Sequence, residues 1–262
     1  ITTEAERRSI ALHEAGHASI SWLLEYANPL IKVTIVPRGR ALGAAWYLPE
    51  ERQITTKEQM LDEMCATLGG RAAEDLFLNR ISTGAMNDLE RVTKQAYGMI
   101  AYLGMSDKLP NLCYYNNEEY SFNRPYSEKT AELIDTEVKN MVNEQYERAK
   151  KILSEHREGH NQLAQLLIDK EVIFAEDVER IFGKRPWASR SEEIMAAKES
   201  QEAAEAEKRL AEEVKEKEKE IKEEEAENST EEKEATEAKI TVEGKVSIEK
   251  KVISAEGGKK TT

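Results

Sequence analysis

Two histidines and a glutamate near the start of the chain have the spacing of a zinc-hydrolase motif. His13, Glu14 and His17 form the pattern H-E-x-x-H. Four residues of an α-helix turn by about 400°, so the two imidazoles stand on one face and can share one Zn²⁺. Glu14, about 100° further round the helix, is placed to take a proton from an attacking water. The competing interpretation is a chance match, in which the histidines are exposed side chains on a surface helix and bind no metal.

The flanking sequence predicts that this segment is helical. Thr3 and Glu6 have the spacing of a capping box, and Asn28-Pro29 ends the pattern. A glycine inside a helix, here Gly16, costs about 1 kcal/mol relative to alanine. We therefore expect another segment to pass close to the helix at that point. The buried face is predicted from spacings of three and four residues: Ile10, His13, His17, Ile20 and Leu24.

A catalytic zinc needs a third protein ligand, which the local sequence does not supply. In the longer pattern H-E-x-x-H-x-x-G-x-x-H, the glycine and the third histidine would stand where this chain has Ile20 and Leu23. The ligand must therefore be a distant acid, and spacing alone does not choose among the candidates. These are Glu58, Glu63, Glu74, Asp75 and Asp88.

The remaining periodicities predict a mainly α domain with a small β-hairpin or sheet beside the H-E-x-x-H helix. The run 31–36 is β-branched and alternating, and 44–48 reads as its partner strand. This second strand either packs over the H-E-x-x-H helix or presents an exposed edge on which an extended peptide can pair. The residues of such an edge would be Gly43, Ala44, Ala45 and Trp46. A helix beginning with a Thr55–Glu58 capping box contains Gly69-Gly70, which allows a bend or close packing. Further predicted elements are helices at 87–103, 127–155, 158–169 and 174–182 and a long loop at 104–126.

Composition divides the 262 residues into a domain, 1–187, and a Glu/Lys-rich tail, 188–262, expected to be disordered or a solvated helix. All three tryptophans, nine tyrosines, four phenylalanines and two cysteines precede residue 188. The net charge of −13 gives no basic footprint, so no nucleic-acid partner is expected. No run is apolar enough to span a bilayer, and we expect the fragment itself to be soluble.

Two further sets of potential metal ligands are weaker. Cys65 and Cys113 show neither metal-site spacing nor a disulfide framework, which favours a reducing compartment. His156 and His160 are also four residues apart, but the intervening glutamate is offset and the surroundings are charged. We interpret this second histidine pair as structural.

Residues 1–187 resemble the peptidase domain of the FtsH-type AAA+ proteases, which are membrane-anchored, ATP-dependent zinc metalloproteases. Six blocks in the family's order carry the resemblance. They are Arg7-Arg8 with Ala11–Ala18, Val36–Gly43, Leu68–Glu74, Thr83–Leu89, Gly104–Leu109 and Ile134–Val138. One departure is proline in place of the more usual glycine after Leu109.

The resemblance implies a zinc endopeptidase with Asp88 as the third ligand and Glu14 as the general base. It also implies Glu74 as a partner of a ligating histidine, Zn²⁺ as cofactor and polypeptides as substrates. In the family these domains form homo-hexamers, with an upstream ATPase module and a membrane anchor, at the cytoplasmic face of the bacterial inner membrane. The phosphate-binding pattern G-x-x-x-x-G-K-[ST] does not occur in this sequence. Rival functions are an inactive ring scaffold and a small-molecule metallohydrolase.

Overall fold

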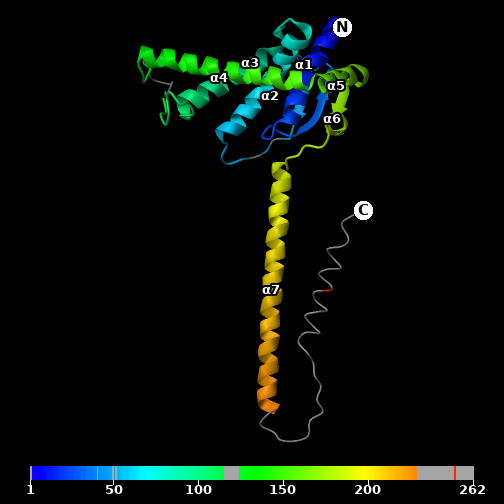
Figure 1. The fold of residues 1–262 in the computed structure, drawn as a ribbon, viewed down its shortest axis with the longest axis vertical. Coiled ribbons are helices and arrows are strands. Elements are labelled where there is room, and N and C mark those ends of the chain that lie inside the picture. Colours follow the sequence, from blue (N-terminus) through cyan, green and yellow to red (C-terminus); the bar gives the residue numbers. More distant parts are fainter. Residues whose placement is uncertain are drawn as a thin grey trace. The chain divides into compact units, whose positions relative to one another are not determined.

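The computed structural model describes residues 2–39, 41–48, 50, 52–114, 124–228 and 251. These residues form a mainly helical fold with one small sheet, as the sequence predicts (Figure 1). The chain divides into two compact units, residues 1–197 and 198–262. The boundary after residue 187 between the domain and the tail, which the composition suggests, stays a prediction.

Helix α1, Glu4–Leu23, is the central element of the first unit. It begins with the predicted Thr3–Glu6 capping box. Every residue from Ala11 to Trp22 is buried, so the helix is covered on all sides rather than along one stripe. It ends four residues before the predicted end at residue 27. Leu24, which caps the helix, has an extended backbone, a turn follows at residues 25–26, and the side chains of Leu24 and Ala27 are buried in the core.

Helix α2, Lys57–Leu78, crosses α1 at unusually short range. A Cβ atom on Gly16 would lie 2.3 Å from the carbonyl oxygen of Gly69, and only glycine avoids this clash. The expectation that another backbone passes close to Gly16 is confirmed. The capping box of α2 is formed by Thr56 and Gln59. The prediction of Thr55 and Glu58 was therefore wrong by one residue, because two overlapping sequences satisfy the same pattern.

The three-stranded sheet lies against α1. Strands β1 (Leu30–Thr34), β2 (Ala44–Tyr47) and β3 (Val172–Phe174) are antiparallel in the order β2-β1-β3. Val33 is paired with Ala45 on one side and Ile173 on the other. The sequence predicted β1 and β2 but not β3. Three residues are too few for a periodic signal, and the strand exists only because β1 pairs with it.

The remaining helices of the first unit pack on α1 and α2. The single helix predicted at 87–103 is α3 (Met86–Tyr97), followed by a π-helical turn (Gly98–Tyr102) and preceded by a 3₁₀ turn (Thr83–Ala85). The predicted loop at 104–126 is irregular over 104–114, and residues 115–123 lie outside the described part of the chain. Three apolar clusters hold these elements together. The other helices are α4 (Glu128–Glu155), α5 (Arg157–Lys170) and α6 (Ala175–Phe182).

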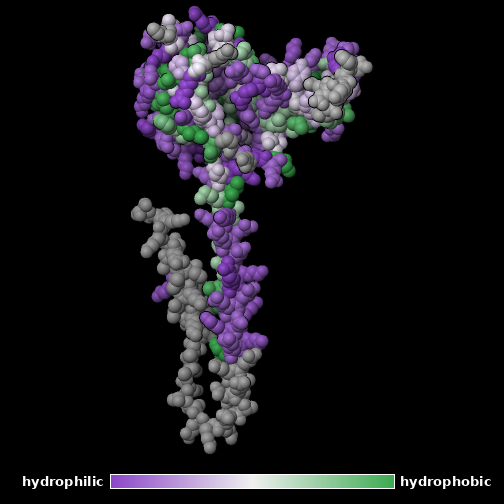
Figure 2. Space-filling model, turned by 180° about the vertical axis from the view of Figure 1, so that it is seen from behind, coloured by the Kyte–Doolittle hydropathy of each residue, from purple (hydrophilic) through white to green (hydrophobic). Residues whose placement is uncertain are grey.

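The chain continues from the first unit into a long charged helix, α7 (Arg190–Asn228). Its surface is mostly hydrophilic (Figure 2). Oppositely charged side chains four residues apart, such as Glu205 and Arg209 at 3.8 Å, support such a helix. Part of the segment expected to be disordered or a solvated helix is thus helical, and 229–250 and 252–262 lie outside the described residues. Within the part of the chain that the structure describes, no helix is both long and apolar enough to cross a membrane.

Candidate metal centre

Three side-chain atoms from two helices converge on one point. Nε2 of His13 lies 3.0 Å from Nε2 of His17, and Oδ2 of Asp88 lies 3.3 Å and 3.2 Å from these nitrogens. Tetrahedral ligands at about 2.0–2.1 Å from a zinc ion are roughly 3.3–3.4 Å apart. Among the described residues this is the one group of histidine, cysteine or acidic side chains compact enough to hold a metal.

The structure separates the five acids that the sequence left as candidates. Asp88 alone among them reaches both histidine nitrogens. Glu63 lies 3.9 Å from an arginine of α3, and Asp75 accepts hydrogen bonds from a tyrosine and a lysine of α4. Glu58 lies in the first turn of α2. Glu74 approaches the far side of one histidine ring.

Asp88 reaches the histidines because of the turn that begins α3. Ser82 caps the 3₁₀ turn by accepting a hydrogen bond from the Gly84 N–H at 3.1 Å. The same hydroxyl donates to Oε1 of Glu74 at 2.5 Å, which ties the start of α3 to α2. Asp88 then lies in the first turn of α3, and its carboxylate is directed at α1.

The two histidine rings are oriented by different contacts. Nδ1 of His17 lies 2.9 Å from the Ala66 carbonyl, which accepts its proton and leaves Nε2 with its lone pair. His13 is held by packing, since a Cβ atom on Gly70 would come within 2.4 Å of its Nε2. Oε1 of the buried Glu74 lies 3.7 Å from Nδ1 of His13, an ion-pair distance longer than a hydrogen bond. Glu74 therefore lies beside His13, and its role as a partner of a ligating histidine stays a prediction.

The charge balance of the three side chains favours a cation. Burial alone would lower the pKa of His13, but the carboxylates of Asp88 and Glu74 outweigh it and raise that pKa to about 9. Burial acts to raise the pKa of Asp88, and the two histidines outweigh it and hold the pKa below its ordinary value. In the metal-free domain, a proton on His13 therefore balances the negative charge of the Asp88 and Glu74 carboxylates. A bound metal cation would balance the same charge. Two nitrogens and one carboxylate oxygen are a donor set that fits Zn²⁺.

Glu14 lies next to this group without joining it. Its side chain is buried, and a Cβ atom on Gly43 would lie only 2.7 Å from its Oε1. Burial raises the pKa of Glu14, while His17 and His13 act to lower it. A carboxylate with a raised pKa beside a metal site has the character of a general base.

A cleft of about 890 Å³ gives access to these residues. Gly43, Ala44 and Ala45 line it, and β2 is an edge strand whose one partner among the described strands is β1. Trp46 does not line the cleft. Its side chain points to the face opposite those of its strand neighbours Ala45 and Tyr47, which line the cleft, and its ring lies beneath Nζ of Lys32 at 4.7 Å. Several other lining residues were not predicted from the sequence, because they come together only in the fold: Ser21, Ala27, Asn28, Tyr47, Arg80 and Arg91.

Comparison with known proteins agrees with this geometry. The model of peptidase family M41 matches residues 1–181. The chain belongs to peptidase family M41. It is 72% identical over 201 residues to the "ATP-dependent zinc metalloprotease FtsH" of Parabacteroides distasonis, covering 76% of this chain and 29% of that protein. It is 48% identical over 190 residues to the mitochondrial "ATP-dependent zinc metalloprotease FTSH 10" of Arabidopsis thaliana, covering 72% and 23%.

The mouse "Mitochondrial inner membrane m-AAA protease component AFG3L2" is 44% identical over 188 residues, covering 71% of this chain and 23% of that protein. The chain thus spans less than a third of the length of each of these relatives. The resemblance to an FtsH-type peptidase domain is confirmed, and residues 1–181 of this chain form an M41 peptidase domain.

The second histidine pair of the M41 domain is structural. His160 is fully buried, donates from Nε2 to the Leu12 carbonyl at 2.9 Å and stacks on Phe77. Nδ1 of His156 instead lies 2.9 Å from the Ile152 carbonyl. The interpretation of this pair as a structural feature agrees with these contacts, which tie α5 to α1 and cap α4.

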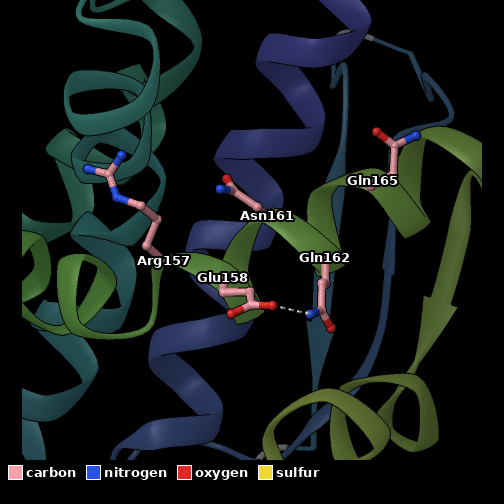
Figure 3. Close-up of a pocket in the computed structure, with 5 residues that line it drawn as sticks. All are labelled: Arg157, Glu158, Asn161, Gln162 and Gln165. Carbon is pink, nitrogen blue, oxygen red and sulfur yellow. Dashed lines mark hydrogen bonds between the residues drawn. The ribbon is translucent and has the colours of Figure 1, made fainter.

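A second hollow of the M41 domain, about 570 Å³, lies along α5 (Figure 3) and has no lining residue in common with the cleft. All five residues that line it come from that helix, and Glu158 accepts a hydrogen bond from Gln162 at 3.5 Å. Its polar side chains lie side by side on one helix and contribute nothing to the metal centre. They are Arg157, Glu158, Asn161, Gln162 and Gln165.

Proposed function

We propose that this domain is a zinc endopeptidase in which His13, His17 and Asp88 hold Zn²⁺ and Glu14 is the general base. The observation that carries the proposal is the approach of the three ligand atoms to within 3.0–3.3 Å of one another. Zinc bound there would supply Lewis-acid polarisation of the attacking water and of the scissile carbonyl. Glu74 would act through His13, by holding the orientation of its ring.

Glu14 carries the proton transfers. Its carboxylate accepts a proton from the water that attacks the scissile carbonyl and then gives it to the leaving amine. Two features support this role: burial that raises its pKa, and a position beside the histidines but outside the ligand group. A raised pKa makes the carboxylate a better proton acceptor.

The substrate would be an extended polypeptide. β2 presents, beside Glu14, an edge with which no other described strand pairs, and peptides commonly bind such edges by adding a strand. Gly43 leaves room for the backbone to approach, because it has no side chain over Oε1 of Glu14. We assign the binding edge to Gly43, Ala44 and Ala45, while Trp46 serves the opposite face of the strand.

In the parent protein we propose that the domain degrades unfolded or membrane proteins. The printed names of the relatives describe ATP-dependent proteases, and one describes a mitochondrial inner membrane component. By analogy, an ATPase module and a membrane anchor of the parent chain would deliver substrates to a homo-hexamer of these domains. For a bacterial parent, this assembly would lie at the cytoplasmic face of the inner membrane.

Casein turnover by the zinc-loaded chain, with and without a chelator, tests the proposal. We expect turnover that a chelator abolishes and added Zn²⁺ restores. Glu14→Gln should retain zinc at about one ion per chain and lose turnover, because only the base is removed. Zinc binding without any peptide hydrolysis would support an inactive scaffold. Hydrolysis of small esters or amides without casein cleavage would support a small-molecule hydrolase.

A further inference from the structure

Arg185, in the segment that follows α6, binds the end of α1, the helix that carries His13 and His17. The guanidinium of Arg185 lies among four backbone carbonyl oxygens and donates to all of them. Nη2 donates to Leu24 at 2.8 Å, to Ala27 at 3.2 Å and to Glu25 at 3.3 Å, and Nε donates to Trp22 at 3.3 Å. These are carbonyls of the last turn of α1 and of the chain just after it.

An arginine suits this position for two reasons. The last four carbonyls of a helix have no intrahelical partner, and a cation at that end also complements the helix dipole. The last turn of α1 contains no basic residue of its own. Arg185 supplies both the positive charge and a planar fork of donors, which a lysine lacks. Burial lowers the pKa of this guanidinium, and Glu50 and Glu192 oppose that shift.

The loop that Arg185 holds, residues 24–28, is also held from its other side. The backbone N–H of Tyr26 donates to Oδ2 of Asp62 at 3.1 Å, and Oδ1 of Asp62 accepts from Arg148 at 2.8 Å. In addition, Nε1 of Trp22 donates to the Gly183 carbonyl at 2.8 Å. Two charged side chains from other parts of the chain, Arg185 and Asp62, therefore hold the loop through its backbone.

This loop forms part of the cleft wall. Ala27 and Asn28 line the cleft, and so does Ser21 one turn after His17. Arg185 itself does not line it. Neither Arg185 nor the carbonyls that it binds belong to the ligand group. The wall can therefore be loosened without changing the metal ligands or the base.

We propose that Arg185 is a positioning residue for peptide binding, which keeps the 24–28 loop in place as the wall at one end of the cleft. The proposal rests on the endopeptidase function proposed above. The proposal predicts an effect that depends on the length of the peptide. Peptides long enough to reach Ala27 and Asn28 should bind less well without Arg185, while the rate of hydrolysis of bound peptide stays the same.

The test uses the full 262-residue chain with Arg185→Ala, Arg185→Lys and, as the matched control, Lys184→Ala. Lys184 is the exposed cation next in sequence. Fluorogenic peptides extended one residue at a time on each side of the scissile bond serve as substrates. For each peptide, kcat and KM are measured, with zinc content per chain determined for each variant.

Arg185→Ala should raise KM about tenfold for peptides that reach the wall, with kcat unchanged, because it removes binding shared by the ground and transition states. KM for the shortest cleaved peptides should be unaltered. Arg185→Lys should lie between wild type and Arg185→Ala, and Lys184→Ala should match wild type. Zinc content should be the same in all four proteins.

The same KM in wild type and both Arg185 variants at every peptide length would overturn the proposal. A loss of kcat, zinc and binding that does not depend on peptide length would also overturn it, since that result marks a purely structural role. If Arg185→Ala does not fold, the length dependence of KM in Arg185→Lys decides. A wild-type chain without chelator-sensitive turnover would instead overturn the endopeptidase function on which the proposal rests.

Discussion

The ring of His13 lies directly against the backbone of Gly70, so closely that a Cβ atom there would come within 2.4 Å of Nε2, the nitrogen proposed to bind zinc. At the same level, Gly16 and Gly69 bring the two helix backbones together. The position of His13, a proposed metal ligand, therefore depends on a residue that has no side chain.

Gly70→Ala should weaken zinc binding although it replaces no ligand. The new methyl group must displace the His13 ring, because the backbone around it is packed. We expect a loss of zinc affinity of about tenfold or more, comparable to the loss of a residue that orients a metal ligand. Zinc titration monitored by competition with a chelating dye measures it.

Gly98→Ala is the matched control for this substitution, because a Cβ atom there has no neighbour within 4 Å. It should leave zinc affinity unchanged and stabilise the helix by about 0.5–1 kcal/mol. Equal zinc affinities of the Gly70 and Gly98 variants would contradict the steric argument.

Asp88→Asn and Glu74→Gln should both weaken zinc binding, but Asp88→Asn should weaken it more. Asp88→Asn removes a carboxylate from the ligand group and should abolish most zinc binding and all hydrolysis. Glu74→Gln should weaken zinc binding only about 10–100-fold, as expected for a residue that orients a ligand. Zinc content after dialysis and casein turnover provide the measurements. The assignment of Asp88 would be rejected by full zinc occupancy in Asp88→Asn together with none in Glu74→Gln.

The metal-free domain should become less stable, and bind zinc more tightly, as the pH rises. The folded-state pKa of His13 is about 9, above the ordinary value of 6.5. Its stabilisation is therefore complete below pH 6.5 and is lost as the pH rises through 9. Zinc must displace this proton, so zinc affinity should increase over the same range.

Thermal melting of the metal-free chain between pH 6 and 9.5 measures the first effect, and zinc titration across that range measures the second. The His13→Ala variant, which lacks the titrating group, is the control for melting. A melting temperature of the wild type that rises with pH between 6.5 and 9 would contradict the sign of this argument.

Removal of residues 198–262 should leave the melting temperature and peptidase activity nearly unchanged. The described residues 198–222 are almost all exposed, so their loss uncovers little apolar surface. Truncation after residue 181, where the M41 match ends, should lower the melting temperature. It removes Arg185 and the hydrogen bond from the backbone N–H of Arg190 to Glu50. Calorimetry measures the melting temperatures of both truncated chains. Equal values would show that residues 182–197 contribute nothing to the thermal stability of the domain.

Much of the fold could be predicted from local patterns. The capping residues and apolar spacing of α1 predicted its start, and the strand alternation predicted β1 and β2. Errors occur where two local signals overlap, as at Thr55 and Thr56, or where a segment is too short to have a period, as in β3. The end of α1 was placed four residues too late, and the carbonyls of the residues that follow the helix bind Arg185, which is far away in the sequence.

The sequence by itself determined the first half of the site, because His13, Glu14 and His17 lie on one helix whose period sets their relative directions. It also determined the close helix crossing, since the cost of Gly16 inside a helix indicates a close neighbour. Only the tertiary structure decided among the acids by distance, bringing Asp88 to the two imidazoles and directing Asp75 to α4. The reason is that helix geometry relates residues within a few turns, whereas contacts between α1, α3 and the segment after α6 depend on how whole elements pack.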